Sequence, residues 1–198
     1  MKKNILLSLA IVLIATSISA QVPKPITLYV GGGITKPTAM EYLDEYWKSG
    51  YNLNAGIGLN FLPMFQTVIK AQYHQLPLDK DELGITLPIE LPDFRAVTIG
   101  LEGRFNMANP AMKIKPYVFG GAGIAITTFS AFEAEALEGT NIAFTNLEDA
   151  NKFYYSFGGG LELKSFLLIS IYAQIEMIQI ATEFETTQLI PFTVGIKF

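Results

Sequence analysis

The residue types that most often carry chemistry are scarce in this chain. It has one histidine, His74, and no cysteine, so neither a zinc site built from imidazole and thiolate ligands nor a disulfide is expected. The segment that carries His74 holds no serine to form a histidine–serine pair for nucleophilic catalysis. We therefore predict no catalytic residue, no metal ligand and no bound cofactor, and we expect His74 to make a hydrogen bond inside the fold.

Charged side chains, by contrast, recur at alternate positions within otherwise apolar segments. Alternate positions share one face of an extended strand, so these charges would all point to the same side. They are four basic and three acidic residues: Lys70, Glu102, Arg104, Glu162, Lys164, Glu176 and Lys197. Because an unpaired charge in a confined space is costly, we predict that they pair in one network. Two roles stay open, a structural plug or a gate that opens a path for small solutes.

The elements that would hold these charges are β-strands. In residues 51–61 the odd-numbered positions are apolar and the even-numbered positions are Asn or Gly, and similar alternation recurs along the chain. The expected strands are residues 26–35, 51–61, 65–74, 97–105, 116–127, 153–164, 169–177 and 190–198. Most exceed the usual length of about five to six residues in soluble sheets, and at a tilt of about 40° they would span an apolar band of about 25 Å.

Composition indicates which face lies outside. The chain is 50% hydrophobic and 16% charged, with a mean hydropathy of +0.33, whereas soluble domains are about one quarter charged. No apolar run of about 20 residues could form a membrane helix. A polar inner face with an apolar outer face is stable in lipid, so we predict an all-β fold, an eight-stranded antiparallel up-and-down transmembrane β-barrel. Glycines on the inner face should leave room for larger luminal side chains: Gly56, Gly58, Gly100, Gly158, Gly160 and Gly195.

The N-terminal residues have the pattern of a secretory signal peptide. Lys2 and Lys3 are followed by an apolar run over residues 5–15 and by a cleavage site after Ala20. We therefore predict a cleaved signal peptide over residues 1–20 and a single barrel domain over residues 21–198. With no cysteine there is no residue for lipoprotein attachment.

The connections between the expected strands alternate in length and charge. The first, third, fifth and seventh connections include the three longest and hold 15 of the 18 Asp and Glu residues. The other three carboxylates lie on the inner face, and none faces lipid, where a charge at mid-depth is destabilising. This sorting predicts a bacterial outer-membrane protein with periplasmic termini and acidic outer connections, in contact with outer-membrane lipid and lipopolysaccharide.

Four segments resemble a known family. Residues 46–50, 54–58, 115–123 and 192–198 are similar to those of OmpA-like, eight-stranded outer membrane protein beta-barrel domains of the porin family. The resemblance covers essentially the whole predicted domain and implies the barrel fold. It also implies an assembly signal in the last strand, Phe198 with Ile196 and Val194, read by the outer-membrane assembly machinery. A peptidoglycan-binding domain like that of longer family members is not expected here.

Several functions stay open for such a barrel. The favoured one is a structural or cell-surface interaction role, and the alternative is a narrow porin-like channel for small solutes. A membrane-embedded enzyme similar to lipid A deacylases would need a lipid-facing histidine and serine, and alternation places His74 inside. The acidic segments 79–82 and 133–138 could bind divalent cations or form a solvated surface. Trp47, with Tyr42 and Tyr46, is expected in the outer aromatic belt. A pI near 5.0 argues against a nucleic-acid partner.

Overall fold

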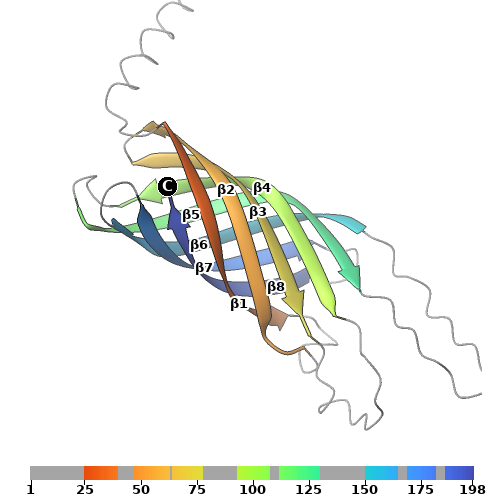
Figure 1. The fold of residues 1–198 in the computed structure, drawn as a ribbon. Helices are drawn as coiled ribbons and strands as arrows, with labels where there is room; N and C mark the ends of the chain where they lie inside the picture. The colour runs from red at the N-terminus through yellow and green to blue at the C-terminus, as the bar shows by residue number, and fades with distance from the viewer. Residues whose placement is uncertain are drawn as a thin grey trace, which may run out of the picture.

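The computed structural model describes residues 25–39, 47–62, 64–77, 93–107, 112–129, 150–164, 169–181 and 186–198. Eight strands in these ranges form a closed antiparallel barrel in which each strand pairs with the next and β1 pairs with β8 (Figure 1). They are β1 Ile26–Ala39, β2 Gly50–Leu62, β3 Phe65–Leu76, β4 Phe94–Asn106, β5 Ile114–Phe129, β6 Ala150–Lys164, β7 Ser170–Ala181 and β8 Thr186–Lys197. The predicted eight-stranded up-and-down barrel is confirmed. Among the described residues, no helix has the length and apolarity to cross a membrane.

The two ends of the barrel differ in their connections. Phe198 closes the seam between the first and last strands, because its N–H donates to Leu28 O at 2.9 Å and its carbonyl accepts from Leu28 N–H at 3.2 Å. The short β2–β3 turn at Met64 lies at this same end, where Asn106 N–H donates to Met64 O. Since even barrels keep their termini in the periplasm, we name this the periplasmic end and the opposite one the outer end.

Alternation along each strand separates a lipid-compatible outside from a filled inside. Leu28, Ile69 and Leu101 point outward and are 49%, 50% and 59% exposed, whereas their neighbours along the strands, such as Lys70 and Glu102, are buried. An apolar surface that surrounds the whole barrel far exceeds the patches found on soluble monomers. Such a surface is stable against lipid hydrocarbon, and the buried polar residues then face the lumen.

Inward glycines make the space that large luminal side chains occupy, as the sequence predicted. A Cβ added to Gly160 would lie 2.6 Å from Tyr117 Cζ, and one added to Gly158 would lie 2.6 Å from Phe119 Cζ. Gly195 is similarly covered, because its Cβ would lie 2.5 Å from Tyr172 Cζ. Aromatic side chains from one strand therefore fit over glycines of a neighbouring strand, and this fit fills a barrel of only eight strands.

The strands extend further toward the outer end than the sequence indicated. We expected β7 to end at Met177 and β8 to begin at Ile190, but the strands reach Ala181 and begin at Thr186. The extension turns Ile178, Ile180 and Leu189 inward, where all three are fully buried. The polar inner face that the sequence predicted therefore does not extend to the outer end, because alternation continues there with apolar residues on the inner face.

Some expectations fall on residues outside the described ranges. The predicted signal peptide, the acidic segments 79–82 and 133–138, Tyr42 and Tyr46 are among them.

Candidate functional site in the barrel lumen

The middle of the lumen holds four charged side chains that pair across the barrel. Lys70 Nζ on β3 lies 2.6 Å from Glu102 Oε2 on β4 and 2.8 Å from Glu176 Oε1 on β7. Arg104 Nη2 lies 2.7 Å from Glu102 Oε1. Two cations and two carboxylates thus balance in charge. We call Lys70, Glu102, Arg104 and Glu176 the central ion cluster.

Glycines beside Lys70 let this cluster cross the lumen. The residues in register with Lys70 on the two flanking strands are Gly56 and Gly100, neither of which places a side chain beside it. The lysine side chain therefore extends over the lumen to Glu176 on the far wall. Gln72 completes the contact, because its Nε2 donates to Glu176 Oε2 at 2.9 Å.

Aromatic rings hold the guanidinium of Arg104 in place. Its Cζ lies 4.4 Å from the ring centroid of Tyr117, 4.7 Å from that of Tyr29 and 5.7 Å from that of Phe119. Rings at these distances attract a cation through their quadrupole, and more strongly where water is excluded. Alternation alone does not single out these three aromatic residues, because β1 and β5 are rich in glycine. Thr27 on β1 and Thr127 on β5 face the lumen, so counting in steps of two along each strand would have placed Tyr29, Tyr117 and Phe119 inside.

A second ion pair lies near the periplasmic mouth. Lys197 Nζ is 2.7 Å from Glu162 Oε2. Lys115, which we expected in a connection, is the second residue of β5 and lies in register with Glu162. Lys164 has the parity of the luminal charges, yet it is exposed at the end of β6 and forms no ion pair with another described residue. Of the seven predicted charges, four therefore meet in the central ion cluster, two pair near the mouth, and Lys164 stands apart.

His74 belongs to a chain of hydrogen bonds above the central ion cluster. Thr193 Oγ1 donates to Asn52 Oδ1 at 3.0 Å, and Asn52 Nδ2 donates to Thr35 Oγ1 at 3.1 Å. Thr35 Oγ1 and His74 Nδ1 are then hydrogen-bonded at 2.9 Å. The expected luminal hydrogen bond of His74 is present. Its Nε2 is buried without a hydrogen-bond partner among the described residues.

The outer end of the lumen is closed by apolar side chains. Trp47 is only 7% exposed and packs edge to face on Phe94, with ring centroids 5.9 Å apart. Lys48 N–H donates to Pro77 O at 3.0 Å and so fastens the segment after Trp47 to the end of β3. We call this group the outer plug: Trp47, Leu76, Phe94, Ile178, Ile180 and Leu189. The expectation that Trp47 joins the outer aromatic belt is wrong, because the chain carries it into the barrel mouth.

The two features fill much of the described part of the lumen with buried side chains. A hydrated ion that enters from the outside meets apolar side chains that offer it no ligand, and deeper in it meets charges already paired with one another. Displacing a partner from a buried ion pair leaves an uncompensated charge, which is strongly destabilising. No group of three or more His, Cys, Asp or Glu side chains within the described ranges is placed to hold a metal ion.

Comparison with known proteins identifies the architecture. No family model and no curated protein matches the sequence. Among solved structures, Neisserial surface protein A matches with a TM-score of 0.61 and 10% identity over 88% of this chain and 96% of its own. Ail, the attachment invasion locus protein of Yersinia pestis, matches with a TM-score of 0.52 and 14% identity over 87% and 97%. The N-terminal β-barrel domain of Pseudomonas aeruginosa OprF matches with a TM-score of 0.51 and 11% identity over 88% and 98%.

The chain has the fold of small bacterial outer-membrane β-barrels. This fold and the apolar exterior together place the protein in the bacterial outer membrane. At such low sequence identity the structural similarity supports the fold alone, and function has to be argued from the site.

Proposed function

We propose that the protein is an integral outer-membrane β-barrel with a closed lumen and a structural or cell-surface interaction role. The observation that carries the proposal is the presence of two barriers in series, the outer plug and the central ion cluster. A continuous path for solutes would require both to move. Side chains from facing walls that bond across the lumen also make the barrel rigid, which suits an anchor.

Interaction at the cell surface is supported by where the chain places its long and acidic connections. The long connections all leave the outer end of the barrel, and 15 of 18 carboxylates lie in the four outer connections. Loops on a rigid scaffold are the usual carriers of binding function in proteins. Ail is named the attachment invasion locus protein of Yersinia pestis, and a surface role of that general kind is what we propose here.

We further propose that the barrel belongs with OmpA-like, eight-stranded barrels and is assembled as they are. The resemblance in four sequence segments supports this grouping. Phe198, Ile196 and Val194 form an exposed apolar row at the end of the chain, as expected of a signal for the assembly machinery. A signal peptide over residues 1–20 would deliver a barrel domain of residues 21–198 to that machinery.

We also propose that the protein is not an enzyme. A lipid-modifying site would need its histidine on the lipid-facing surface, but His74 is fully buried in the lumen and bonded to Thr35. No described serine makes a hydrogen bond with His74. The candidate nucleophile and base are therefore not brought together.

A narrow channel is the second candidate, and one observation favours it. Three buried side-chain nitrogen atoms have no hydrogen-bond partner among the described residues: His74 Nε2, Asn54 Nδ2 and Arg104 Nη1. Buried polar atoms of this kind are commonly satisfied by water, and waters beside them would be the start of a path through the lumen. Isolated waters make no continuous path, however, and apart from the Trp47 indole N–H the outer plug presents only hydrocarbon to them.

Single-channel recording on the refolded wild-type protein in a planar lipid bilayer tests the closed lumen. We expect no steady conductance steps, while migration on a cold SDS gel that changes on boiling shows that the barrel is folded. Steady steps from the folded protein would contradict the proposal and establish the channel. For the surface role, protease added to intact cells should cut within residues 78–92 or 130–149, and protection of both segments would contradict it.

A further inference from the structure

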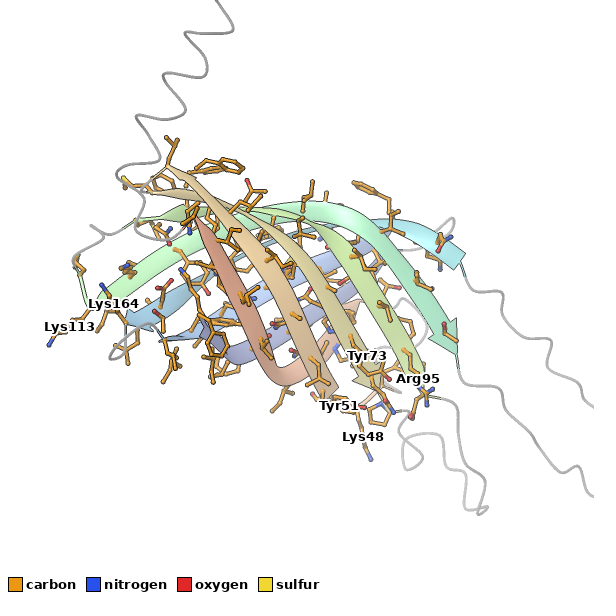
Figure 2. The ribbon with its side chains drawn as sticks, turned by 45° about the horizontal axis from the view of Figure 1, so that its top comes forward. Lys48, Tyr51, Tyr73, Arg95, Lys113 and Lys164 are labelled. Atoms are coloured by element: carbon orange, nitrogen blue, oxygen red, sulfur yellow. The ribbon has the colours of Figure 1, made fainter. Side chains whose placement is uncertain are left out.

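A polar patch interrupts the apolar exterior at the outer end of β2, β3 and β4. Tyr51 and Tyr73 both donate their hydroxyl protons to Gln75 Oε1, at 2.7 and 2.8 Å. The two rings lie 6.1 Å apart, and Gln75 Nε2 donates to Asp93 Oδ2 at 2.5 Å. Figure 2 shows Tyr51, Tyr73 and Arg95 gathered at this end of the barrel. The side chains are thus held in place by one another rather than spread freely over the surface.

Two exposed cations flank these tyrosines. Arg95 on β4 is in register with Gln75, and Lys36 on β1 lies one residue beyond the pair formed by Thr35 and Gly50. Both are exposed, and neither forms an ion pair with another described residue. Neighbouring strands are about 4.8 Å apart, so the two cations are separated by about 14 Å across the sheet. We call Lys36, Tyr51, Tyr73, Gln75 and Arg95 the tyrosine–arginine patch.

These residues occupy the outward-facing alternate positions of their strands, so the patch lies on the lipid side of the barrel. Arg95 shares its face with Ile99, Leu101 and Phe105, which are all exposed apolar residues. The part of β4 from residue 97 to residue 105 spans roughly 20–25 Å along the membrane normal at a tilt of about 40°. Arg95 therefore lies at the outer edge of the apolar band, at the depth of lipid headgroups.

We propose that the tyrosine–arginine patch binds the phosphate groups of lipid A, the anionic lipid of the outer leaflet. A guanidinium offers a planar fork that matches phosphate oxygens, and a lysine at the other edge offers a second cation. The tyrosine rings present apolar faces to acyl chains and hydroxyls to the headgroup, as aromatic residues at membrane interfaces do. The inference depends on placement in the outer membrane and is independent of whether the lumen is closed.

The favoured occupant is a lipid rather than a soluble partner because of the direction in which the patch faces. A protein or a sugar in the medium would approach from above the outer end, whereas these side chains stand on the lipid-facing wall. The chain also provides a matched control at its opposite end. Lys113 and Lys164 are two exposed cations at the periplasmic end (Figure 2). Their place in the alternation is that of residues that face the lumen rather than the lipid.

Binding of lipid A to the barrel in phospholipid nanodiscs tests the proposal. The probe is lipid A with both phosphates, counted on the intact protein by native mass spectrometry during a titration. The patch variant Lys36→Gln/Arg95→Gln is compared with the control variant Lys113→Gln/Lys164→Gln, which removes the same charge. We expect the apparent Kd to rise about tenfold in the patch variant and less than about twofold in the control.

Two further binding measurements identify the ligand. Lipid A without its phosphates should bind the wild type about tenfold more weakly. Millimolar inorganic phosphate should not displace bound lipid A. If the patch variant fails to show the folded band on a cold SDS gel, Arg95→Lys replaces it and should weaken binding by about threefold, because it keeps the charge and loses the fork.

The proposal is overturned by any of three results. These are unchanged lipid A binding in the patch variant, an equal loss in both double variants, and full displacement by inorganic phosphate. The equal loss would mean that net charge alone attracts the lipid. Displacement would mean a site for free anions.

Discussion

At the residue scale, the lumen depends on how buried charges are compensated. Glu102 is the centre of the cluster because it accepts from both cations: Lys70 Nζ at 2.6 Å, and Arg104 Nη2 at 2.7 Å and Nε at 3.1 Å. Removing its charge leaves two cations facing the single carboxylate of Glu176. In an interior that excludes water, such an imbalance is far more costly than the loss of a surface pair.

Glu102→Gln should therefore lower the free energy of unfolding by about 3–5 kcal/mol. The matched change Glu162→Gln breaks a pair whose lysine is partly exposed near the mouth, and we expect a loss of about 1 kcal/mol there. Urea unfolding in lipid vesicles, followed by tryptophan fluorescence, measures both. Equal losses in the two variants would show that the central ion cluster has no special weight.

Trp47 allows a direct check on the outer plug, because it is the only tryptophan in the chain. A residue in the aromatic belt would be quenched by brominated lipid, whereas one inside the barrel mouth would not. We expect little quenching of Trp47. As a control, Phe153→Trp in a Trp47→Phe background puts the indole on an outward position that is 59% exposed, and this indole should be quenched strongly. Strong quenching of Trp47 itself would show that this residue lies in the aromatic belt and not inside the barrel mouth.

At the scale of single strands, the glycines of β6 show how the two faces differ. Gly160 faces inward under the Tyr117 ring, and an added Cβ would also lie 2.5 Å from Ala173 O. Gly159 faces outward, where the nearest atom to an added Cβ, apart from its chain neighbours, would be Tyr117 O at 3.4 Å. Adjacent positions on one strand therefore differ in whether a methyl group can be accepted.

Gly160→Ala should destabilise the barrel by about 1–3 kcal/mol, because backbone and ring must both move. Gly159→Ala should be neutral or stabilise it by up to about 1 kcal/mol through the entropy of the unfolded chain. Reversible unfolding in vesicles compares the two. A larger loss for Gly159→Ala would mean that the inward and outward faces of β6 have been exchanged.

The last strand allows the proposed assembly signal to be separated from simple membrane contact. Phe198 and Phe192 both face lipid and are 47% and 51% exposed. Phe198→Ala should reduce the folded protein recovered from cell outer membranes severalfold, while refolding from urea into vesicles stays near the wild type. Phe192→Ala should leave recovery from cells nearly unchanged. Equal recovery of both variants would argue against a special role for the terminal residue.

At the scale of the whole molecule, the sequence was sufficient for the architecture and only partly for the lumen. Alternation is a local property, so residues such as Lys70 and Glu102 could be placed on the inner face from their neighbours alone. The partners of Lys70 could not be derived, because Glu176 comes from the opposite wall and the contact depends on the closed barrel.

The outer plug escaped prediction for a related reason. Ile178 and Ile180 continue the alternation of β7, but they are apolar residues on the inner face with Gln179 outward between them, so polarity no longer indicates which face lies inside. Trp47 precedes β2, and its burial follows from the way the chain folds back over the barrel mouth. Contacts of this kind are tertiary and leave no periodic signal in the sequence.

In the closed lumen that we propose, either of the two barriers alone is enough to block conduction. Glu102→Gln/Arg104→Gln weakens the central ion cluster and leaves the outer plug in place, and Trp47→Gly/Phe94→Gly does the reverse. Each double variant should therefore stay silent. Only their combination should open a path.

Single-channel recording in planar bilayers across this set tests the central claim most directly, once a cold SDS gel has shown that each variant is folded. We expect no steady conductance from the wild type or either double variant, and discrete steps from the quadruple variant. Steady conductance from the wild type, or from either double variant alone, would contradict a lumen closed by two barriers in series.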